Sequence, residues 1–269
     1  MENHPKPLFL RGLSCTETLA QRYRALRVAG RDAASFLQGQ LTQDVTRVAA
    51  GQLRLAALLT PQGRVLATPW LTAREDSIVL LLPTPLAAPV RDGLQRYVLR
   101  ARLVLSLAEL DAGLAALLAE TLAPRCPEPP AADPDADASW TLALIAAGHP
   151  EIGTATSGEW TPQMLNLDLL DAVSMTKGCY TGQEIVARTQ NLGRIKRRMF
   201  RYAAAIAMPP VPKAALHAGG HKVGEVVLAA PTATGSELLA VVNLDARAAP
   251  LALADGAACQ PAPLPYAVP

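Results

Sequence analysis

The sequence predicts an α+β fold with a small β-barrel near its C-terminal end. In the first 122 residues, strand-like and helix-like segments follow one another without the regular strand–helix–strand alternation of a doubly wound fold. After a proline-rich break at 208–212, short strand-like runs are separated by glycine-containing turns over about 60 residues. That second pattern is typical of a small barrel.

Hydrophobic periodicity and turn residues predict the elements one by one. Alternation or a continuous apolar run predicts strands at 23–28, 53–59, 65–71, 78–82, 222–228 and 237–242. Helical spacing predicts helices at 33–37, 86–97, 107–122 and 182–190. Asp32 is expected to cap the first helix, Gly39 to close it, and residues 60–63 to form a hairpin turn.

Two breaks in composition divide the chain. The stretch 124–137 holds five prolines and four acidic residues, too few apolar groups to order itself, which predicts a linker at 124–138. We expect a body over residues 1–200 and a barrel domain over residues 201–269.

Composition and charge exclude several classes of protein. Lys plus Arg is 25 and Asp plus Glu is 23, a net charge of 25 − 23 = +2, whereas a dedicated nucleic-acid protein usually carries a strongly basic domain. We therefore expect no direct nucleic-acid partner.

The longest apolar run, 77–82, is far shorter than the roughly 20 residues of a membrane span. The four cysteines lie far apart, as free thiols in a reducing compartment do. We expect a cytoplasmic monomer without a membrane partner.

The sharpest local signal is the octapeptide 177–184, KGCYTGQE. Thr181 and Glu184 have the spacing of a capping box, so a helix should start near Gly182. Cys179 lies two residues before that helix start, where free N–H groups and the nearby Lys177 favour a thiolate. The alternative is an inert residue in a tight turn, and the spacing leaves both open.

Five cations follow within eight residues: Arg194, Lys196, Arg197, Arg198 and Arg201. They could share one anionic partner, or they could be the solvated face of a strand, and the pattern favours neither. The four histidines have no carboxylate or cysteine cluster beside them, so no metal site is expected. The glycine-rich phosphate motifs and the G-x-S-x-G elbow are absent, which removes the main support for kinase, dehydrogenase and hydrolase activities.

Few aromatic residues are present, so each is of interest. Tyr23 lies in the first predicted strand, and Trp140 and Trp160 flank an otherwise aliphatic segment. Flat ligands with π systems need aromatic or apolar walls with a few directed polar groups. Isolated aromatics are more often ordinary core residues, and these three alone do not establish a ligand site.

The octapeptide, with the IVAR that follows it, resembles the signature of the YgfZ family of folate-binding proteins, which is related to the T-protein (aminomethyltransferase) of the glycine cleavage system. Three further stretches agree with that family: 36–45 (FLQGQLTQDV), 157–166 (SGEWTPQMLN) and 263–266 (PLPY). The resemblance is strong over about 23–65 and 140–200 and weak over 70–138 and the tail.

The resemblance implies a T-protein-like fold, with two interleaved α+β subdomains and a C-terminal barrel around a central folate channel. It also implies tetrahydrofolate as cofactor and a role in making or maintaining iron–sulfur client enzymes, including one that modifies tRNA. Tyr23 and Trp140 fall at positions that line the folate site in the family. Gln183 and Glu184 belong to the signature loop, as do Lys177 and Cys179, the expected reactive group. Arg194 and Arg197 would help to hold the anionic part of the ligand.

Two departures from the T-protein pattern bear on activity. Ala67 and Thr68 stand where the enzyme carries an aspartate pair, so no carboxylate handles the proton of methylene transfer. Aminomethyltransferase activity is therefore not expected. Ala146 stands where the enzyme has a glutamate that would bond the pterin. Loss of such a bond costs on the order of 1.5–3 kcal/mol, or about ten- to a hundredfold in affinity.

Three hypotheses follow. The leading one is a tetrahydrofolate-binding accessory factor for iron–sulfur proteins. The second is a tetrahydrofolate-dependent one-carbon transferase that uses some other base, against which the missing aspartates count. The third is an interaction module that has lost folate binding, which Ala146 slightly favours.

Overall fold

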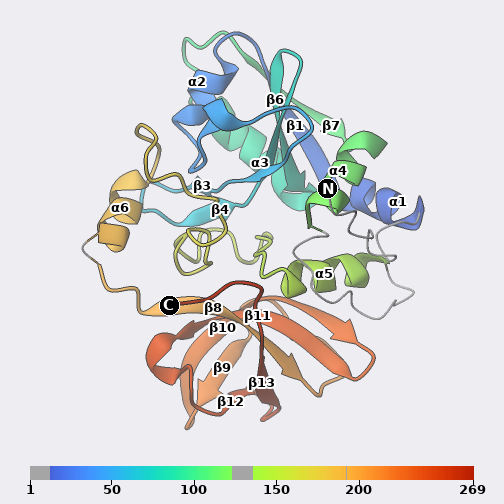
Figure 1. The fold of residues 1–269 in the computed structure, drawn as a ribbon, viewed down its shortest axis with the longest axis vertical. Helices are drawn as coiled ribbons and strands as arrows, with labels where there is room; N and C mark the ends of the chain where they lie inside the picture. Colours follow the sequence, from blue (N-terminus) through green and yellow to red (C-terminus); the bar gives the residue numbers. More distant parts are fainter. Residues whose placement is uncertain (1–12, 123–135, 192) are drawn as a thin grey trace, which may run out of the picture.

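The computed structural model describes residues 13–122, 136–191 and 193–269. Three parts follow one another along the long axis of the molecule (Figure 1). An antiparallel sheet with its helices lies at one end, a closed barrel lies at the other, and α5, α6 and long irregular segments lie between them. Mixed α and β structure with a C-terminal barrel was predicted from the sequence, and both are confirmed.

The five-stranded sheet has the order β2-β5-β6-β1-β7. Its strands are β1 (Tyr23–Ala29), β2 (Arg54–Leu55), β5 (Trp70–Arg74), β6 (Ser77–Pro83) and β7 (Val104–Glu109). β1 pairs antiparallel with β6 on one side and with β7 on the other. Every residue of β6 is buried, which explains the continuous apolar run in its sequence.

The helices cover the sheet and fill the middle of the molecule. They are α1 (Leu13–Arg22), α2 (Ala33–Gln38), α3 (Thr84–Gln95), α4 (Ala112–Leu122), α5 (Ala136–Ala146) and α6 (Gln183–Asn191). The described residues also include two short 3-10 turns, η2 (Val45–Arg47) and η4 (Leu244–Ala246). No helix in the described ranges is both long and apolar enough to cross a bilayer.

The barrel closes in the order β10-β11-β8-β13-β12-β9. Its strands are β8 (Arg197–Ala204), β9 (Ala215–Ala218), β10 (His221–Thr232), β11 (Gly235–Asn243), β12 (Leu251–Leu253) and β13 (Ala258–Ala262). β8 begins at Arg197, so the first barrel strand starts before the boundary that we drew at residue 201. The barrel has its own apolar core, and α5 packs against β10 and β11.

Several predicted elements are wrong in detail. The run 53–59 divides into β2 and β3 (Leu58–Leu59), and 65–71 divides into β4 (Val65–Ala67) and the start of β5. The predicted helix 107–122 divides into the end of β7 and α4. The predicted linker lies mostly outside the described residues, but its last three residues belong to α5.

The cap of α2 also differs from the prediction. Asp32 occupies the cap position but its side chain makes no bond to the helix, because its carboxylate accepts instead from the backbone N–H of Arg102 at 2.7 Å. The side chain therefore joins the start of α2 to the segment before β7.

Candidate ligand-binding site

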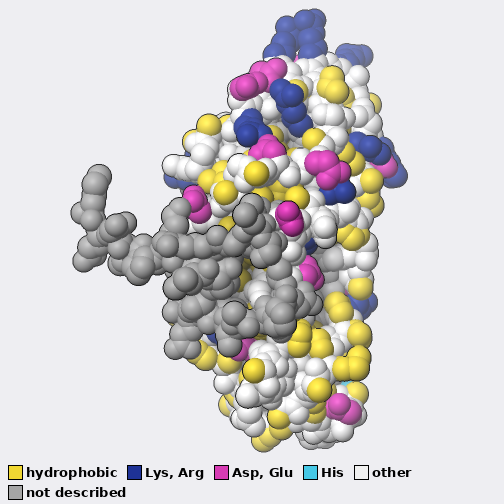
Figure 2. Space-filling view, turned by 90° about the vertical axis from the view of Figure 1, so that its right-hand side faces the viewer, with side chains coloured by type: hydrophobic (Ala, Val, Ile, Leu, Met, Phe, Trp, Pro, Cys, Tyr) yellow, Lys and Arg dark blue, Asp and Glu magenta, His cyan; other side chains and the backbone are white. Residues whose placement is uncertain are grey.

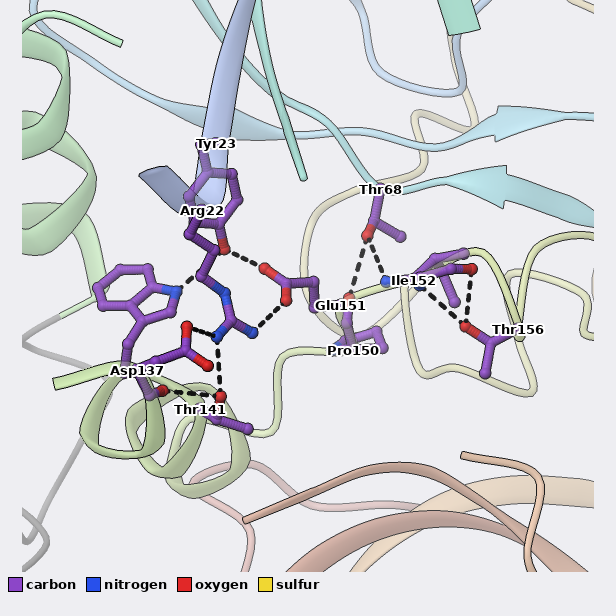
Figure 3. Close-up of polar contacts among 11 residues, drawn as sticks. Arg22, Tyr23, Thr68, Asp137, Thr141, Pro150, Glu151, Ile152 and Thr156 are labelled. Carbon is purple, nitrogen blue, oxygen red and sulfur yellow. Dashed lines mark hydrogen bonds and ion pairs between the residues drawn. The ribbon is translucent and has the colours of Figure 1, made fainter. Parts of the chain in front are cut away.

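Tyr23 and Trp140 meet where β1 begins beside α5 (Figure 3). Their ring centroids lie 6.2 Å apart, the ring planes are nearly perpendicular, and the indole Nε1 donates to the phenol oxygen at 3.0 Å. Both side chains are almost completely buried. Tyr23 and Trp140, the two aromatic residues singled out from the sequence, are thus in direct contact.

Glu151 completes this group with a carboxylate. Tyr23 donates its hydroxyl hydrogen to one carboxylate oxygen, and the Arg22 guanidinium pairs with the other. Burial and the neighbouring Glu151 raise the pKa of Tyr23 well above its usual value, so the phenol stays protonated and remains a donor.

Arg22 links the carboxylate to α5. Its guanidinium contacts Asp137 and donates to the Thr141 hydroxyl at 3.0 Å, while its other terminal nitrogen pairs with Glu151. Burial lowers the pKa of Arg22, but the charges of Glu151, Tyr23 and Asp137 and the hydrogen bond to Glu151 together outweigh burial, and the pKa is raised. The side chains of Arg22 and Glu151 remain 15% and 12% exposed, more than either aromatic ring.

The local sequence explains why these groups converge. Arg22 ends α1 and Tyr23 begins β1, so the two side chains leave the chain at a helix-to-strand junction. Asp137, Trp140 and Thr141 lie three and four residues apart and therefore share one face of α5. We name Arg22, Tyr23, Asp137, Trp140, Thr141 and Glu151 the polar-aromatic cluster.

Thr68 supports the segment that carries Glu151. Its hydroxyl donates to the backbone oxygen of Pro150 at 3.1 Å and accepts from the backbone N–H of Ile152 at 3.4 Å (Figure 3). The residue that stands in place of a T-protein carboxylate therefore contacts backbone on both sides of Glu151. In the structure, Thr68 therefore helps to hold the backbone on either side of Glu151.

Lys177 of the octapeptide is enclosed by backbone carbonyls. Its ammonium donates to the oxygens of Gln38, Leu41 and Gln43 at 2.6, 2.7 and 3.0 Å and lies 5.1 Å from the centre of the Tyr180 ring. Burial lowers the pKa of Lys177 to about 8, against an opposing effect of Asp44. These contacts make Lys177 a tie between the signature loop and the segment after α2.

Apart from the buried Tyr180, the rest of the octapeptide is more exposed. Cys179 is an exposed free thiol. Gln183 accepts at its side-chain oxygen from the backbone N–H of Tyr180 at 3.3 Å, and exposed Glu184 pairs with Arg188 at 2.9 Å. The helix does start at Gln183, but the side-chain bond at its start is made by Gln183, and Glu184 does not form the capping box that we predicted.

The five cations after α6 do not form one clamp. Arg198 is buried in a two-point ion pair with Asp168, at 2.6 and 2.9 Å, and Arg201 pairs with Glu237 at 2.7 Å. Arg194 and Lys196 are exposed, as is Arg197, which donates to the side-chain oxygen of Asn243 at 2.9 Å. A shared anionic partner for all five is therefore wrong, because two of them have buried or half-buried acidic partners.

Six of the eight predicted site residues thus fall into two groups. Tyr23 and Trp140 lie in the polar-aromatic cluster at α5, while Lys177, Cys179, Gln183 and Glu184 lie at the start of α6, on the other side of the middle layer in Figure 1. Arg194 and Arg197, which follow α6, belong to neither group. Across the described residues, no three His, Cys, Asp or Glu side chains gather as metal ligands.

Glu151, Arg22 and Asp137 were missed by the sequence interpretation. Glu151 lies 128 residues from Tyr23 in the chain, so no local sequence pattern could predict their contact. The one usable signal was an acidic residue five positions after Ala146, on the far side of a glycine turn.

Comparison with known proteins adds named relatives. An uncharacterized protein of Haemophilus influenzae is 33% identical over 202 residues, 66% of this chain and 70% of that protein. Proteins named "tRNA-modifying protein YgfZ" are 29% identical over 240 residues in Edwardsiella ictaluri (72% of each chain) and 26% over 231 residues in Colwellia psychrerythraea (70% and 71%). No protein-family model matches the chain.

Among solved structures, the glycine cleavage system aminomethyltransferase T of Bartonella henselae is similar in fold. The TM-score is 0.67, and the match covers 93% of this chain and 88% of that one at 18% identity. At that identity the likeness shows the fold alone.

Proposed function

The chain belongs to the YgfZ family, related to the glycine cleavage T-protein, and we propose that it is a tetrahydrofolate-binding accessory protein that supports iron–sulfur enzymes. A role in tRNA modification fits the names of its relatives. The polar-aromatic cluster is the single observation that carries the folate part of the proposal.

The chemistry of the cluster suits a pterin ring. A pterin presents an edge of N–H donors, and a carboxylate that is partly open to solvent complements that edge. Glu151 supplies such a carboxylate, and each of its oxygens keeps a further lone pair beyond the bond to Arg22 or Tyr23. Glu151 thereby compensates for the glutamate that Ala146 replaces.

Burial decides which atoms a ligand meets first. Tyr23 and Trp140 are 2% and 1% exposed, whereas Arg22 and Glu151 keep 15% and 12% of their side chains exposed. A ligand would therefore contact the Arg22–Glu151 ion pair first. The two buried rings would support that pair from the protein interior, through the bond from Tyr23 to Glu151. Folate would be bound here by orientation and hydrogen bonding, and Cys179, exposed at the other group, would act toward the iron–sulfur client.

The transferase alternative has less support. Thr68 is engaged by backbone groups and Ala67 has no polar atom, so the T-protein's carboxylate pair has no counterpart at these positions. The interaction-module alternative remains an outcome of the test below.

The test is an anaerobic calorimetric titration of tetrahydrofolate into the wild type, Glu151→Gln and Glu159→Gln. Saturable binding is expected for the wild type, with affinity reduced about ten- to a hundredfold in Glu151→Gln because a charged acceptor is lost. Glu159→Gln removes an exposed glutamate paired with Lys213 and should bind like the wild type. Trp140→Ala is a poorer probe, since removing a buried Trp costs about 3–5 kcal/mol of stability.

Each contrary result has a definite meaning. No saturable heat at millimolar ligand would reject folate binding and favour the interaction module. Wild-type affinity in Glu151→Gln would remove the cluster from the ligand site. The iron–sulfur part is tested separately by complementation, in which Cys179→Ala should fail to restore client activity to a deletion strain, and full restoration would reject it.

A further inference from the structure

A basic and apolar surface lies at the end of the sheet farthest from the barrel. It comprises residues 96–104, RYVLRARLV, together with the neighbouring Arg31, and we name it the arginine edge. The register of β1 places Ala29 opposite Val104, so the turn after β1 and the segment before β7 meet at this end. Figure 2 shows Lys and Arg side chains gathered at the upper end of the molecule.

The apolar side chains of this surface are unusually open to solvent. The described residues include six exposed large hydrophobic side chains, and three of them lie within this segment: Tyr97 at 53%, Leu99 at 87% and Val104 at 66%. An exposed leucine alone is ordinary, but a cluster of three between cations marks an interaction surface.

β7 adds an open strand edge. Among the described residues it is the last strand of its sheet and pairs only with β1, so within them its outer side presents backbone N–H and C=O groups. Val104, Ser106 and Ala108 are exposed along it. An added strand would find main-chain partners there, with the exposed apolar residues beside it.

Three arginines on this surface have no acidic partner within the described residues. Arg96, Arg100 and Arg102 are exposed, and within the described parts of the chain their side chains make no hydrogen bond or ion pair. Arg31 lies 3.7 Å from Asp32, which also accepts from the Arg102 backbone. Asp76, at the same end, is paired with Arg27. The unpaired guanidinium groups therefore complement carboxylates that a partner would bring.

We infer that the arginine edge docks an extended acidic and apolar segment of a partner protein, which adds as a strand to the outer side of β7. Two features favour a peptide over RNA. The open strand edge binds backbone amides that RNA lacks, and the net charge of the chain is only +2. The inference is independent of folate binding, since none of these residues belongs to the polar-aromatic cluster.

The test measures fluorescence anisotropy of a labelled nonapeptide of alternating glutamate and valine. A lysine–valine peptide and single-stranded oligouridylate serve as competing probes. Binding of the acidic peptide should weaken about tenfold or more in the double variant Arg100→Glu/Arg102→Glu. The control Arg47→Glu/Lys222→Glu makes the same charge change at exposed positions elsewhere and should bind like the wild type. Amide hydrogen exchange of 104–109 should slow when the acidic peptide binds.

The other outcomes overturn the inference. They are no binding of the acidic peptide, equal binding to the Arg100→Glu/Arg102→Glu variant, unchanged exchange in β7, or preference for the RNA. A tetrahydrofolate titration of the same variant keeps the two proposals apart, because its result should equal that of the wild type whether or not the peptide binds.

Discussion

At the scale of single residues, Lys177 has contacts that make a specific prediction. Its ammonium satisfies three buried carbonyls, so Lys177→Met should lower the free energy of unfolding by about 2–3 kcal/mol near neutral pH. The folded-state pKa is lowered to about 8 from 10.5, so the folded protein releases this proton before the unfolded chain does. Stability of the wild type should then rise relative to the variant between about pH 8 and pH 10.5.

Denaturant unfolding at about pH 7.5 and about pH 9.5 checks both parts. The gap between wild type and Lys177→Met should widen by about 1–2 kcal/mol at the higher pH. A gap that is constant or narrows with pH would contradict the lowered pKa, and a variant as stable as the wild type would contradict the role of Lys177 as a tie.

The residues of the site were only partly predictable. Tyr23 and Trp140 were singled out from the sequence, and they do contact each other. Their polar partners were not, because the bonds from Arg22 and Tyr23 to Glu151 join residues well over 100 positions apart and leave no local pattern. The five cations between Arg194 and Arg201 are the opposite case. Their nearness in sequence suggested that they share one anionic partner, but the buried Arg198 is already paired with Asp168.

At the scale of elements, the strand signal was clear where burial is complete and weak where the chain bends. β1 and β6 were found because long apolar or alternating runs leave no competing period. The segment 104–109 alternates, but Leu107 also continues the helical spacing of Leu110 and Leu114, so the end of the strand was merged into the predicted helix 107–122. The hairpin at 60–63 was predicted and is present, with Gly63 N–H donating to Thr60 at 2.9 Å.

That hairpin fixes the start of α6 through Gly182, which gives a prediction about packing of elements. Gly182 has φ +80°, and a Cβ there would lie 2.6 Å from the backbone oxygen of Thr60. Gly182→Ala should therefore cost at least about 2 kcal/mol of stability, because both the backbone angle and the hairpin must shift.

Gly93 is the matched control, because it lies in α3 and a Cβ there meets nothing within 4 Å. Gly93→Ala should raise the free energy of unfolding by about 0.5–1 kcal/mol through helix propensity. Thermal and denaturant unfolding measure both variants. Equal effects of the two substitutions would show that α6 is not held against the hairpin.

At the scale of the whole molecule, the C-terminal segment joins the barrel to the candidate site. Tyr266 donates to the backbone oxygen of Gly148 at 2.8 Å and accepts from Asn166, whose side-chain amide also donates to Met199 of β8 at 2.8 Å. Gly148 forms the turn between α5 and Glu151, and a Cβ there would lie 2.7 Å from the Tyr266 ring. The position of Glu151 therefore depends on a residue near the other end of the chain.

This dependence predicts two effects of Tyr266→Phe. Loss of the hydroxyl leaves the buried Gly148 oxygen without its donor, which should cost about 1–3 kcal/mol of stability. Because the turn before Glu151 is then held less firmly, tetrahydrofolate affinity should also fall, by less than in Glu151→Gln. Unfolding curves and the calorimetric titration measure the two effects on one preparation. Tyr97→Phe, which removes a hydroxyl from a half-exposed ring, should change neither. If Tyr266→Phe lost stability but bound folate like the wild type, the tail would hold the barrel to the body without positioning the site.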